Sequence, residues 1–279
     1  MIKYELIPEQ LLREGILTTQ DLFSPGKINK ELILLAHQLE YWERIRDLKL
    51  SEAEIRRIGF PLNAELVERE RRIAQGTIDG CLHALNHKIA FNIAGGTHHA
   101  GSNWGEGFCL LNDQAIAARF LLKQGLVRQV LIIDLDVHQG NGTAEIFAGE
   151  KEVYTFSMHA ENNFPFRKEK SDLDVGLKDG TTGLEYLTIL AKQLGIIKDM
   201  LKPDFVFYLS GVDVLATDKL GKLALSQNDC RERDRIIIGF CYENKIPMQI
   251  SMGGGYSPEI RHIVDAHCNT FRVAHELHC

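Results

Sequence analysis

The chain has 279 residues, of which 44% are hydrophobic and 25% are charged, as in an ordinary soluble globule. Its 32 Lys and Arg against 38 Asp and Glu give a net charge of −6, which argues against a general nucleic-acid binder, because such proteins carry a basic patch. Six scattered cysteines without Cys-x-x-Cys spacing argue against a disulfide scaffold and a cysteine zinc site. Because the sequence has no signal peptide and no apolar run long enough to cross a membrane, we expect a cytoplasmic protein.

The first 88 or so residues are expected to be mainly helical, since apolar residues recur at helical spacing over 28–48 and 64–85. Short β-rich runs follow, at 89–94, 130–134, 153–158, 205–209 and 248–252. Helical patterns separate most of them, at about 110–124, 183–201 and 226–244. Strands that alternate with amphipathic helices indicate a parallel sheet covered on both faces. We therefore expect a single α/β domain over residues 1–279, with a doubly wound, mainly parallel sheet flanked by helices.

The most informative stretch is Asp134-Leu135-Asp136-Val137-His138, which includes the end of the second β-rich run. Alternate side chains of a strand lie on one face, so Asp136 and His138 can project together from its carboxyl end, where open α/β sheets bind their ligands. An open catalytic metal site needs three protein ligands, and these two residues offer two. A strand end capped by polar loop residues is the alternative interpretation.

The loops after other predicted strands carry the remaining candidates. His98 and His99 follow the first run in a glycine-flanked loop, where both can turn toward one cleft and act as a general base, or form a structural pair. Asp213 follows the fourth run and is either the third metal ligand or a cap or turn residue. Tyr256, after three glycines, can donate to a carbonyl and its oxyanion, or pack in the core.

Two further segments fit the same site. Phe108, in Gly105-Glu106-Gly107-Phe108-Cys109, can form one wall of a narrow channel or pack beside Cys109. Asn141, in Gln139-Gly140-Asn141-Gly142, is either a turn residue or a hydrogen-bond partner of a histidine. Each candidate has a structural explanation of its own, but their placement at successive strand ends favours one common site.

Together these residues resemble the histone deacetylase family of arginase-like metallohydrolases. The resemblance runs from about residue 89 to 258. It is carried, in the family's order, by Gly95-Gly96-Thr97-His98-His99-Ala100, Gly107-Phe108-Cys109, Asp134 to Thr143, Ser157-Met158-His159, Gly211-Val212-Asp213 and Gly253-Gly254-Gly255-Tyr256. The form Gln-Gly-Asn-Gly is more similar to the class IV branch and its bacterial relatives than to class I, which usually carries Asp where this chain has Asn141. The fold implied is that of the arginases and deacetylases.

The resemblance implies a metal centre. Zinc would be bound by Asp136, His138 and Asp213, and ferrous iron is compatible with the same oxygen and nitrogen ligands. A monovalent cation, usually potassium, would lie behind the zinc. The residues near it would be Asp134, Asp136, His138 and Ser157. No organic cofactor is needed for the implied chemistry.

The resemblance also implies catalytic roles. His99 would be the principal general base and then acid, and Asn141 would orient it. His98 would assist electrostatically, with Asp134 as its hydrogen-bond partner. Tyr256 would polarise the acyl carbonyl and bind the oxyanion. Because a neutral Asn cannot stabilise an imidazolium as a carboxylate would, the proton affinity of His99 should be lower than in class I relatives.

A channel for the acyl-lysine side chain is implied as well. Phe108 would line one wall, and an aromatic residue from the segment Asn163-Phe164-Pro165-Phe166 would face it. The sequence does not distinguish between Phe164 and Phe166 for this position. The substrate-binding residues would also include those where glycine permits close backbone approach, namely Gly107, Gly254 and Gly255.

The implied function is removal of acetyl or longer acyl groups from lysine side chains of proteins. Acetylpolyamines or another small acylated amine are alternative substrates, and a non-catalytic acyl-lysine-binding protein is a different interpretation of the same fold. Arginase-like ureohydrolysis would need two metals and more carboxylates. No direct nucleic-acid or membrane partner is expected, and the sequence gives no oligomeric state. Relatives usually carry a further strand before a segment like Lys3-Tyr4-Glu5-Leu6, so the N-terminal edge strand of the family is expected to be absent.

Overall fold

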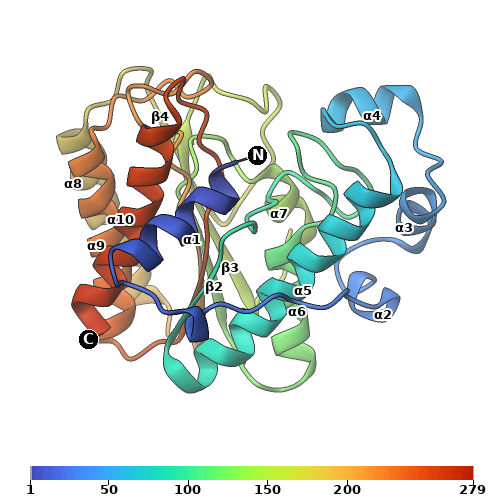
Figure 1. The fold of residues 1–279 in the computed structure, drawn as a ribbon, viewed down its shortest axis with the longest axis horizontal. Coiled ribbons are helices and arrows are strands. Elements are labelled where there is room, and N and C mark those ends of the chain that lie inside the picture. Colours follow the sequence, from blue (N-terminus) through green and yellow to red (C-terminus); the bar gives the residue numbers. More distant parts are fainter. Residues whose placement is uncertain (1, 279) are drawn as a thin grey trace.

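A parallel sheet forms the centre of the molecule (Figure 1). The structure is a computed structural model that describes residues 2–278, and in this range the sheet has six strands in the order β1-β6-β5-β2-β3-β4. All neighbouring strands are parallel. The bounds are β1 Ile89–Asn92, β2 Val130–Asp134, β3 Val153–Ala160, β4 Leu173–Leu177, β5 Phe205–Leu209 and β6 Met248–Ser251. The predicted α/β class with a mainly parallel, helix-flanked sheet is confirmed.

Helices cover both faces of this sheet (Figure 1). One face carries α1 Lys3–Arg13, α8 Gly183–Met200, α9 Gln227–Glu243 and α10 Ile260–His278. The other carries α5 Ala64–His87 and α6 Asp113–Lys123, with α2 Lys30–Ile33, α3 Leu39–Arg46 and α4 Glu52–Ile58 beyond them. The remaining helical segments are η1 Thr19–Asp21 and α7 Asn141–Ile146. No helix within residues 2–278 has both the length and the apolar composition of a membrane span.

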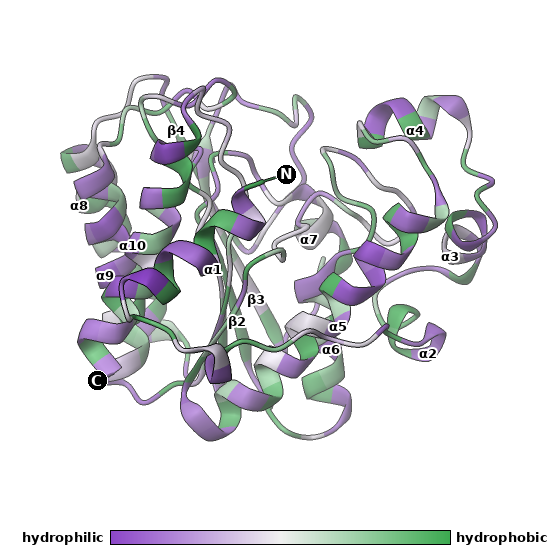
Figure 2. Cartoon of the chain, in the orientation of Figure 1, coloured by the Kyte–Doolittle hydropathy of each residue, from purple (hydrophilic) through white to green (hydrophobic). Residues whose placement is uncertain are grey.

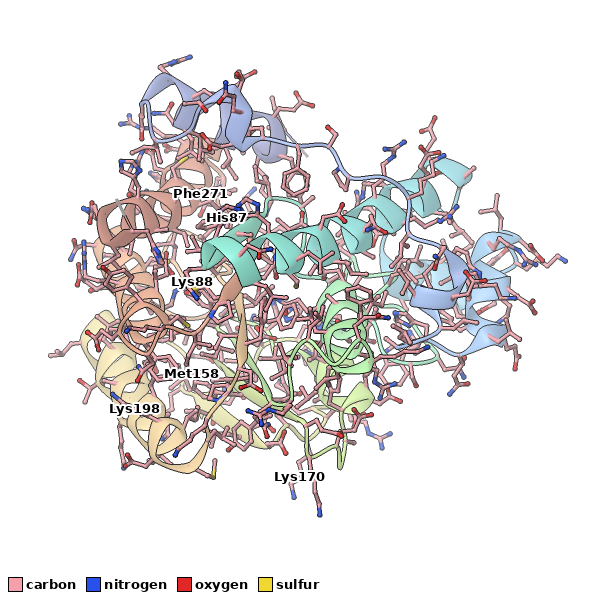
Figure 3. The ribbon with its side chains drawn as sticks, turned by 90° about the horizontal axis from the view of Figure 1, so that it is seen from below. His87, Lys88, Met158, Lys170, Lys198 and Phe271 are labelled. Atoms are coloured by element: carbon pink, nitrogen blue, oxygen red, sulfur yellow. The ribbon has the colours of Figure 1, made fainter. Side chains whose placement is uncertain are left out.

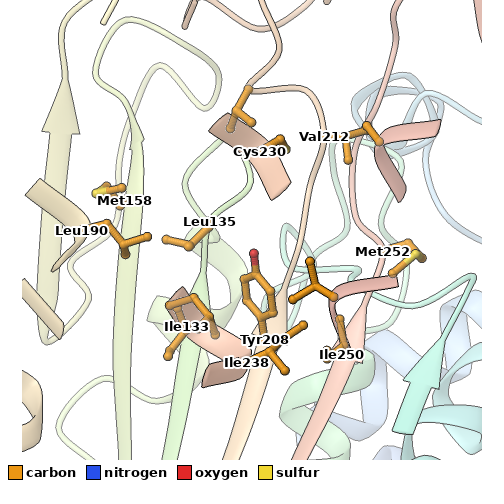
Figure 4. Packing of buried hydrophobic residues seen from close by; sticks show 14 of the residues in the cluster. Ile133, Leu135, Met158, Leu190, Tyr208, Val212, Cys230, Ile238, Ile250 and Met252 are labelled. Atoms are coloured by element: carbon orange, nitrogen blue, oxygen red, sulfur yellow. The ribbon is translucent and has the colours of Figure 1, made fainter. Parts of the chain in front are cut away.

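The sheet separates two hydrophobic cores. Leu131 and Ile133 of β2 face the core under α8, α9 and α10, whereas Val130 and Ile132 face the core under α5 and α6. Because both faces are covered, the central strands are continuously apolar rather than alternating. Figure 4 shows the first core, where Tyr208 of β5 lies among aliphatic side chains from neighbouring strands and helices. Figure 2 shows the helices to be amphipathic, with mixed hydrophilic and hydrophobic stripes.

The amino ends of the strands lie at the edge of the sheet opposite the polar loops. His87 and Lys88 mark the point where α5 ends and β1 begins, as seen from below in Figure 3. The backbone carbonyl of Lys88 accepts a hydrogen bond from Met248 N, at the start of β6. Phe271 of α10 stacks on Phe91 with 4.0 Å between ring centroids.

Two features differ from the sequence expectations. The helical pattern over 28–48 is divided into α2 and α3, because the intervening backbone and side chains are drawn into tertiary hydrogen bonds: Gln38 N donates to Ser102 O, and the His37 ring bonds to the same loop region. The strand β4 was not anticipated. It is one of the two edge strands of the described sheet, and its residues alternate between exposed and more buried positions, so it has no apolar run.

His37 should make the stability of the protein depend on pH. Its Nδ1 lies 3.0 Å from Gly101 O, and its Nε2 accepts from Asn112 N at 2.9 Å, so the neutral ring satisfies both contacts. Burial lowers the pKa of His37 to about 4 from 6.5. Between these two pKa values the unfolded chain binds a proton that the folded chain does not. The contribution of neutral His37 to the free energy of unfolding is therefore fully present above pH 6.5 and is lost as pH falls toward 4.

We expect the free energy of unfolding in urea to fall by about 2 kcal/mol between pH 7 and pH 5 through this group alone. His37→Gln should remove that part of the pH dependence. His275→Gln, at an exposed position of α10, is the matched control and should keep the wild-type slope. Equal slopes for wild type and His37→Gln would contradict the assignment.

Candidate active site

A cavity of about 830 Å³ opens at the carboxyl ends of the strands. It collects loops that follow β1, β2, β3 and β6, together with the start of α1 and the end of α4. Most of the residues singled out in the sequence line it: His98, His99, Gly107, Phe108, Asp136, His138, Phe164, Phe166, Gly254, Gly255 and Tyr256. The chemistry is therefore gathered at one place by the parallel arrangement of the strands.

Asp136, His138 and Asp213 form a buried cluster at the base of this region. Strands β2 and β5 are paired with Asp134 opposite Leu209, so the segments that follow them lie side by side. One ligand atom from each of the three residues lies within 4.8 Å of the other two. His138 Nδ1 is 3.0 Å from Asp136 Oδ1 and 3.3 Å from Asp213 Oδ2. The geometry suits a small cation held by two carboxylates and one imidazole.

The electrostatics of the cluster also fit a cation. Asp213 Oδ2 is buried and accepts no hydrogen bond of good geometry, although His138 is near. Burial and the neighbouring Asp136 carboxylate raise the pKa of Asp213 to about 7, because its negative charge is poorly compensated. A Cβ on Gly254 would lie 1.9 Å from Asp213 Oδ2, so glycine is required for the backbone to pass this close. A divalent ion would supply the missing positive charge.

His98 is held by a carboxylate. Its Nδ1 lies 2.7 Å from Asp134 Oδ2, and both side chains are buried. Burial by itself lowers the pKa of His98, but the charges of Asp134 and Asp136 outweigh it and raise the pKa to about 9. These carboxylates favour the protonated, positively charged ring of His98. Its ring lies 4.1 Å from that of His99, centroid to centroid.

His99 has a neutral partner instead. Its Nδ1 lies 2.7 Å from Asn141 Oδ1, at the first residue of α7. Burial lowers the pKa of His99 well below its usual range, and the charge of His98 adds to this effect. His99 is thus neutral at pH 7. An amide oxygen only accepts hydrogen bonds, so Nδ1 carries the proton and Nε2 keeps its lone pair.

Tyr256 lies over the same cavity. Burial and the nearby carboxylates of Asp213 and Asp136 raise the pKa of Tyr256 well above 10, so its hydroxyl remains a proton donor. Its backbone N donates to Asp218 Oδ2 at 2.6 Å, and its ring lies 6.0 Å from that of Phe108. The phenol is therefore fixed near the metal-binding cluster.

Phe108 is presented by a tight turn. Residues 107 and 108 both have positive φ, +56° and +69°, and the turn is closed by Cys109 N donating to Glu106 O. A positive φ at a bulky residue is strained and is typical of functional sites. The ring of Phe108 packs 5.1 Å from Phe60.

The structure distinguishes the two aromatic residues after β3. The ring of Phe164 lies 5.1 Å from His99 and 6.5 Å from His138, whereas Phe166 is 89% exposed. Phe164 is therefore the aromatic residue next to the candidate catalytic groups, and Phe166 lies at the rim. Both residues follow the same strand, so their spacing alone does not distinguish them.

The candidate monovalent site lies behind the cluster. Ser157 of β3 is paired with Asp134 of β2, and its Oγ is 2.9 Å from His159 Nδ1. Asp134 Oδ1 also accepts from Asp136 N at 3.1 Å. These residues are neighbours, as the resemblance implies, and potassium binding at this place stays a prediction.

Three side chains that shape the site were not singled out in the sequence. Lys3 Nζ donates to Gly253 O at 2.9 Å, Asp218 accepts from the backbone of Tyr256, and Glu106 accepts from Asn141. Lys3 lies 250 residues from its partner, so no local pattern could reveal it. The two glycines that flank Glu106 mark a turn, and they were the available signal for that residue.

The fold is of the arginase and deacetylase type. The HDAC homolog from Aquifex aeolicus has a TM-score of 0.82 at 23% identity, over 98% of this chain and 77% of that chain. The HDA15 HD domain has a TM-score of 0.79 at 24% identity, over 98% and 83%. At this level of sequence identity, the structural similarity shows that these proteins share a fold.

Sequence comparison gives the family. Residues 1–271 match the histone deacetylase domain, and this chain belongs to that family. An uncharacterized protein of Picosynechococcus sp. is 41% identical over 100% of this chain and 93% of its own length. Histone deacetylase 2 of Arabidopsis thaliana is 29% identical over 91% of this chain and 68% of its own length. Human histone deacetylase 1 is 28% identical, and the match spans 57% of it. Family and fold support a hydrolytic deacetylase activity.

Proposed function

We propose that this protein is a metal-dependent deacylase that hydrolyses the amide between an acetyl or longer acyl group and a lysine side chain of a protein. The observation that carries the proposal is the arrangement, in and directly beneath one cavity, of a three-residue cation cluster, a buried histidine whose pKa is lowered and a tyrosine whose pKa is raised. These are the groups that amide hydrolysis requires, and the family assignment supports the same activity.

Asp136, His138 and Asp213 are the residues that would hold the ion, zinc or alternatively ferrous iron. When bound, the ion supplies Lewis acidity to the acyl carbonyl and activates the attacking water. His99 Nε2 takes the proton from this water, since its Nδ1 proton is engaged by Asn141. The low pKa of His99 keeps it unprotonated until attack.

Tyr256 and the histidine pair complete the reaction. The Tyr256 hydroxyl donates to the carbonyl oxygen and stabilises the negative charge that develops there. His98, positively charged beside Asp134, adds electrostatic stabilisation. His99 then returns its proton to the leaving amine. The products are a carboxylate and a free lysine amine. Gly107, Gly254 and Gly255 with Phe108, Phe164 and Phe166 would line the path of the acyl-lysine chain.

Basic side chains at the cavity are paired with carboxylates. Arg56, Arg57 and Lys222 belong to its lining, and they lie 3.4, 3.9 and 3.6 Å from carboxylate oxygens of Glu52, Glu106 and Asp179. These pairs leave little net charge at the entrance, so the proposal of acyl-lysine substrates is supported by the similarity to histone deacetylases. The five described cysteines are all free and buried, which supports location in the reducing cytoplasm.

The proposal is tested by substrate profiling. Protein loaded with Zn²⁺ or Fe²⁺ is assayed against acetyl-lysine to myristoyl-lysine peptides and against acetylspermidine, with kcat/KM as the measurement. We expect acyl-lysine peptides to be turned over with a higher kcat/KM than acetylspermidine. A higher kcat/KM for acetylspermidine would favour the small-amine alternative. Peptide binding without turnover would favour a non-catalytic acyl-lysine-binding protein.

A further inference from the structure

The side chain of Asn141 lies between His99 and a carboxylate. Its Oδ1 is 2.7 Å from His99 Nδ1, and its Nδ2 donates to Glu106 Oε1 at 2.5 Å. The Glu106 side chain is only 13% exposed. The three groups thus form a chain of hydrogen bonds that runs from the cavity to the tight turn at residues 106–109.

The direction of this chain depends on Glu106. The two ends of an Asn amide are nearly equal in size, so sterics alone would allow either end to face the histidine. A carboxylate can only accept hydrogen bonds. Glu106 therefore requires the NH₂ group of Asn141 on its own side, which turns the carbonyl oxygen toward His99. Because that oxygen only accepts, His99 must carry its proton on Nδ1.

We infer that Glu106 is a positioning residue that sets the tautomer of His99 through Asn141. The inference rests on the proposed function, in which Nε2 of His99 is the base. With the amide reversed, the NH₂ group would donate to Nδ1, the ring proton would move to Nε2, and the base would be blocked. A histidine held in the wrong tautomer loses most of its catalytic power, as in the aspartate-to-asparagine variant of a serine-protease triad.

The turn that carries Glu106 is anchored on both sides. Gly107 N donates to Arg57 O at 3.1 Å, and Arg57 Nε donates to Gly105 O at 3.2 Å, which fixes the turn to the end of α4. Arg57 Nε also lies 3.9 Å from Glu106 Oε2. A Cβ on Gly107 would lie 2.6 Å from His99 Cδ2, so the turn also packs directly against the ring. Glu106 is therefore held at a defined distance from Asn141.

Asn141 and Glu106 are a matched pair. An Asp at position 141 could hold His99 Nδ1–H by itself, but here it would face the Glu106 carboxylate across the present 2.5 Å contact. Two carboxylates at this distance cannot both stay ionised without a large penalty. The Asn is thus tolerated because Glu106 orients it, and Glu106 is tolerated because its neighbour is neutral.

The test compares four variants with wild type: Glu106→Met, Glu106→Gln, Asn141→Asp and the double variant Glu106→Gln/Asn141→Asp. Met has a similar length but no strong acceptor, so we expect kcat to fall at least ~10-fold, with KM within about twofold, as for loss of a catalytic tautomer. Gln keeps an acceptor and should retain more activity than Met. The kcat of Asn141→Asp should be strongly reduced. Adding Glu106→Gln should raise that kcat at least ~10-fold, because the Gln amide can donate a hydrogen bond to Asp.

The tautomer itself is measured by nitrogen NMR on zinc-loaded protein with ¹⁵N-labelled histidine, at fixed pH. The His99 signals are assigned by their absence in His99→Phe. Wild type should show the Nδ1–H tautomer, and Glu106→Met should shift the population toward Nε2–H. Glu52→Met removes an exposed acidic charge on α4 and should leave both the tautomer and kcat as in wild type.

The outcomes separate this inference from the proposed function. Wild-type tautomer and kcat in Glu106→Met, or no gain from Glu106→Gln in the Asn141→Asp background, would overturn the role of Glu106. If wild type turns over no acyl substrate, the proposed function fails, while the NMR comparison still decides whether Glu106 sets the tautomer. Thermal unfolding of each variant identifies any that fail to fold. If Glu106→Met does not fold, the comparison of Asn141→Asp with Glu106→Gln/Asn141→Asp decides the role of Glu106.

Discussion

Asp213→Asn should abolish tight metal binding. The substitution removes one of two anionic ligands and leaves His138 and Asp136, which are too few to close the site. We expect metal affinity to fall by more than ~100-fold, which exceeds the loss typical when a residue that only hydrogen-bonds to a metal ligand is removed. Turnover of acyl-lysine should disappear with the metal. Wild type should retain about one divalent ion per chain after dialysis, as an open catalytic zinc site does.

The measurement is metal content by elemental analysis, together with the rise in Tm on adding Zn²⁺. Binding to the folded state alone stabilises it, so wild type should show that rise and Asp213→Asn should not. Asp199→Asn, at an exposed position of α8, is the control and should match wild type. Two tightly held ions per chain would instead support a ureohydrolase-type centre.

Tyr256→Phe should slow the chemical step and little else. The phenyl ring keeps the packing against Phe108, but the hydroxyl that would donate to the oxyanion is gone. We expect kcat to fall ~10²- to 10³-fold, the usual cost of losing one oxyanion donor, while KM and Tm stay close to wild type.

The control for this variant is Tyr242→Phe, which removes a hydroxyl from a half-exposed position on α9 that is not among the residues lining the cavity. Steady-state kinetics on one acyl-lysine peptide decide the result. An unchanged kcat in Tyr256→Phe would remove the oxyanion role from the proposed mechanism.

The sequence predicted the central strands well and the outer elements less well. Strands β2 and β5 begin and end where their apolar runs do, because both faces are buried and the pattern is unambiguous. The edge strand β4 has mixed exposure and was missed. The break between α2 and α3 depends on His37 and Gln38 bonding to a loop some 60 residues away, which no local periodicity encodes.

The same division holds for the site. Residues that follow strands could be found, because parallel strands deliver their carboxyl ends to one edge. Asn141 and Asp134, which bond to the two histidines, could be found for the same reason, but Glu106 and Lys3 could not. Glu106 matters only because Asn141 stands opposite it, and Lys3 only because the chain returns to it at Gly253. Such pairs are fixed by tertiary geometry and leave no signature in spacing.

The contact between Lys3 and Gly253 has a consequence for how the protein becomes competent. It joins residues 250 positions apart, and a bond at the other end of α1, between Arg272 and Glu14, spans 258 positions where α1 packs on α10. Closing such long loops costs conformational entropy, and contacts of high sequence separation slow folding. The loop that carries Tyr256 is held both by Asp218 and by this packing of α1. Enzymatic activity therefore reports on the docking of α1 as well as on the central sheet.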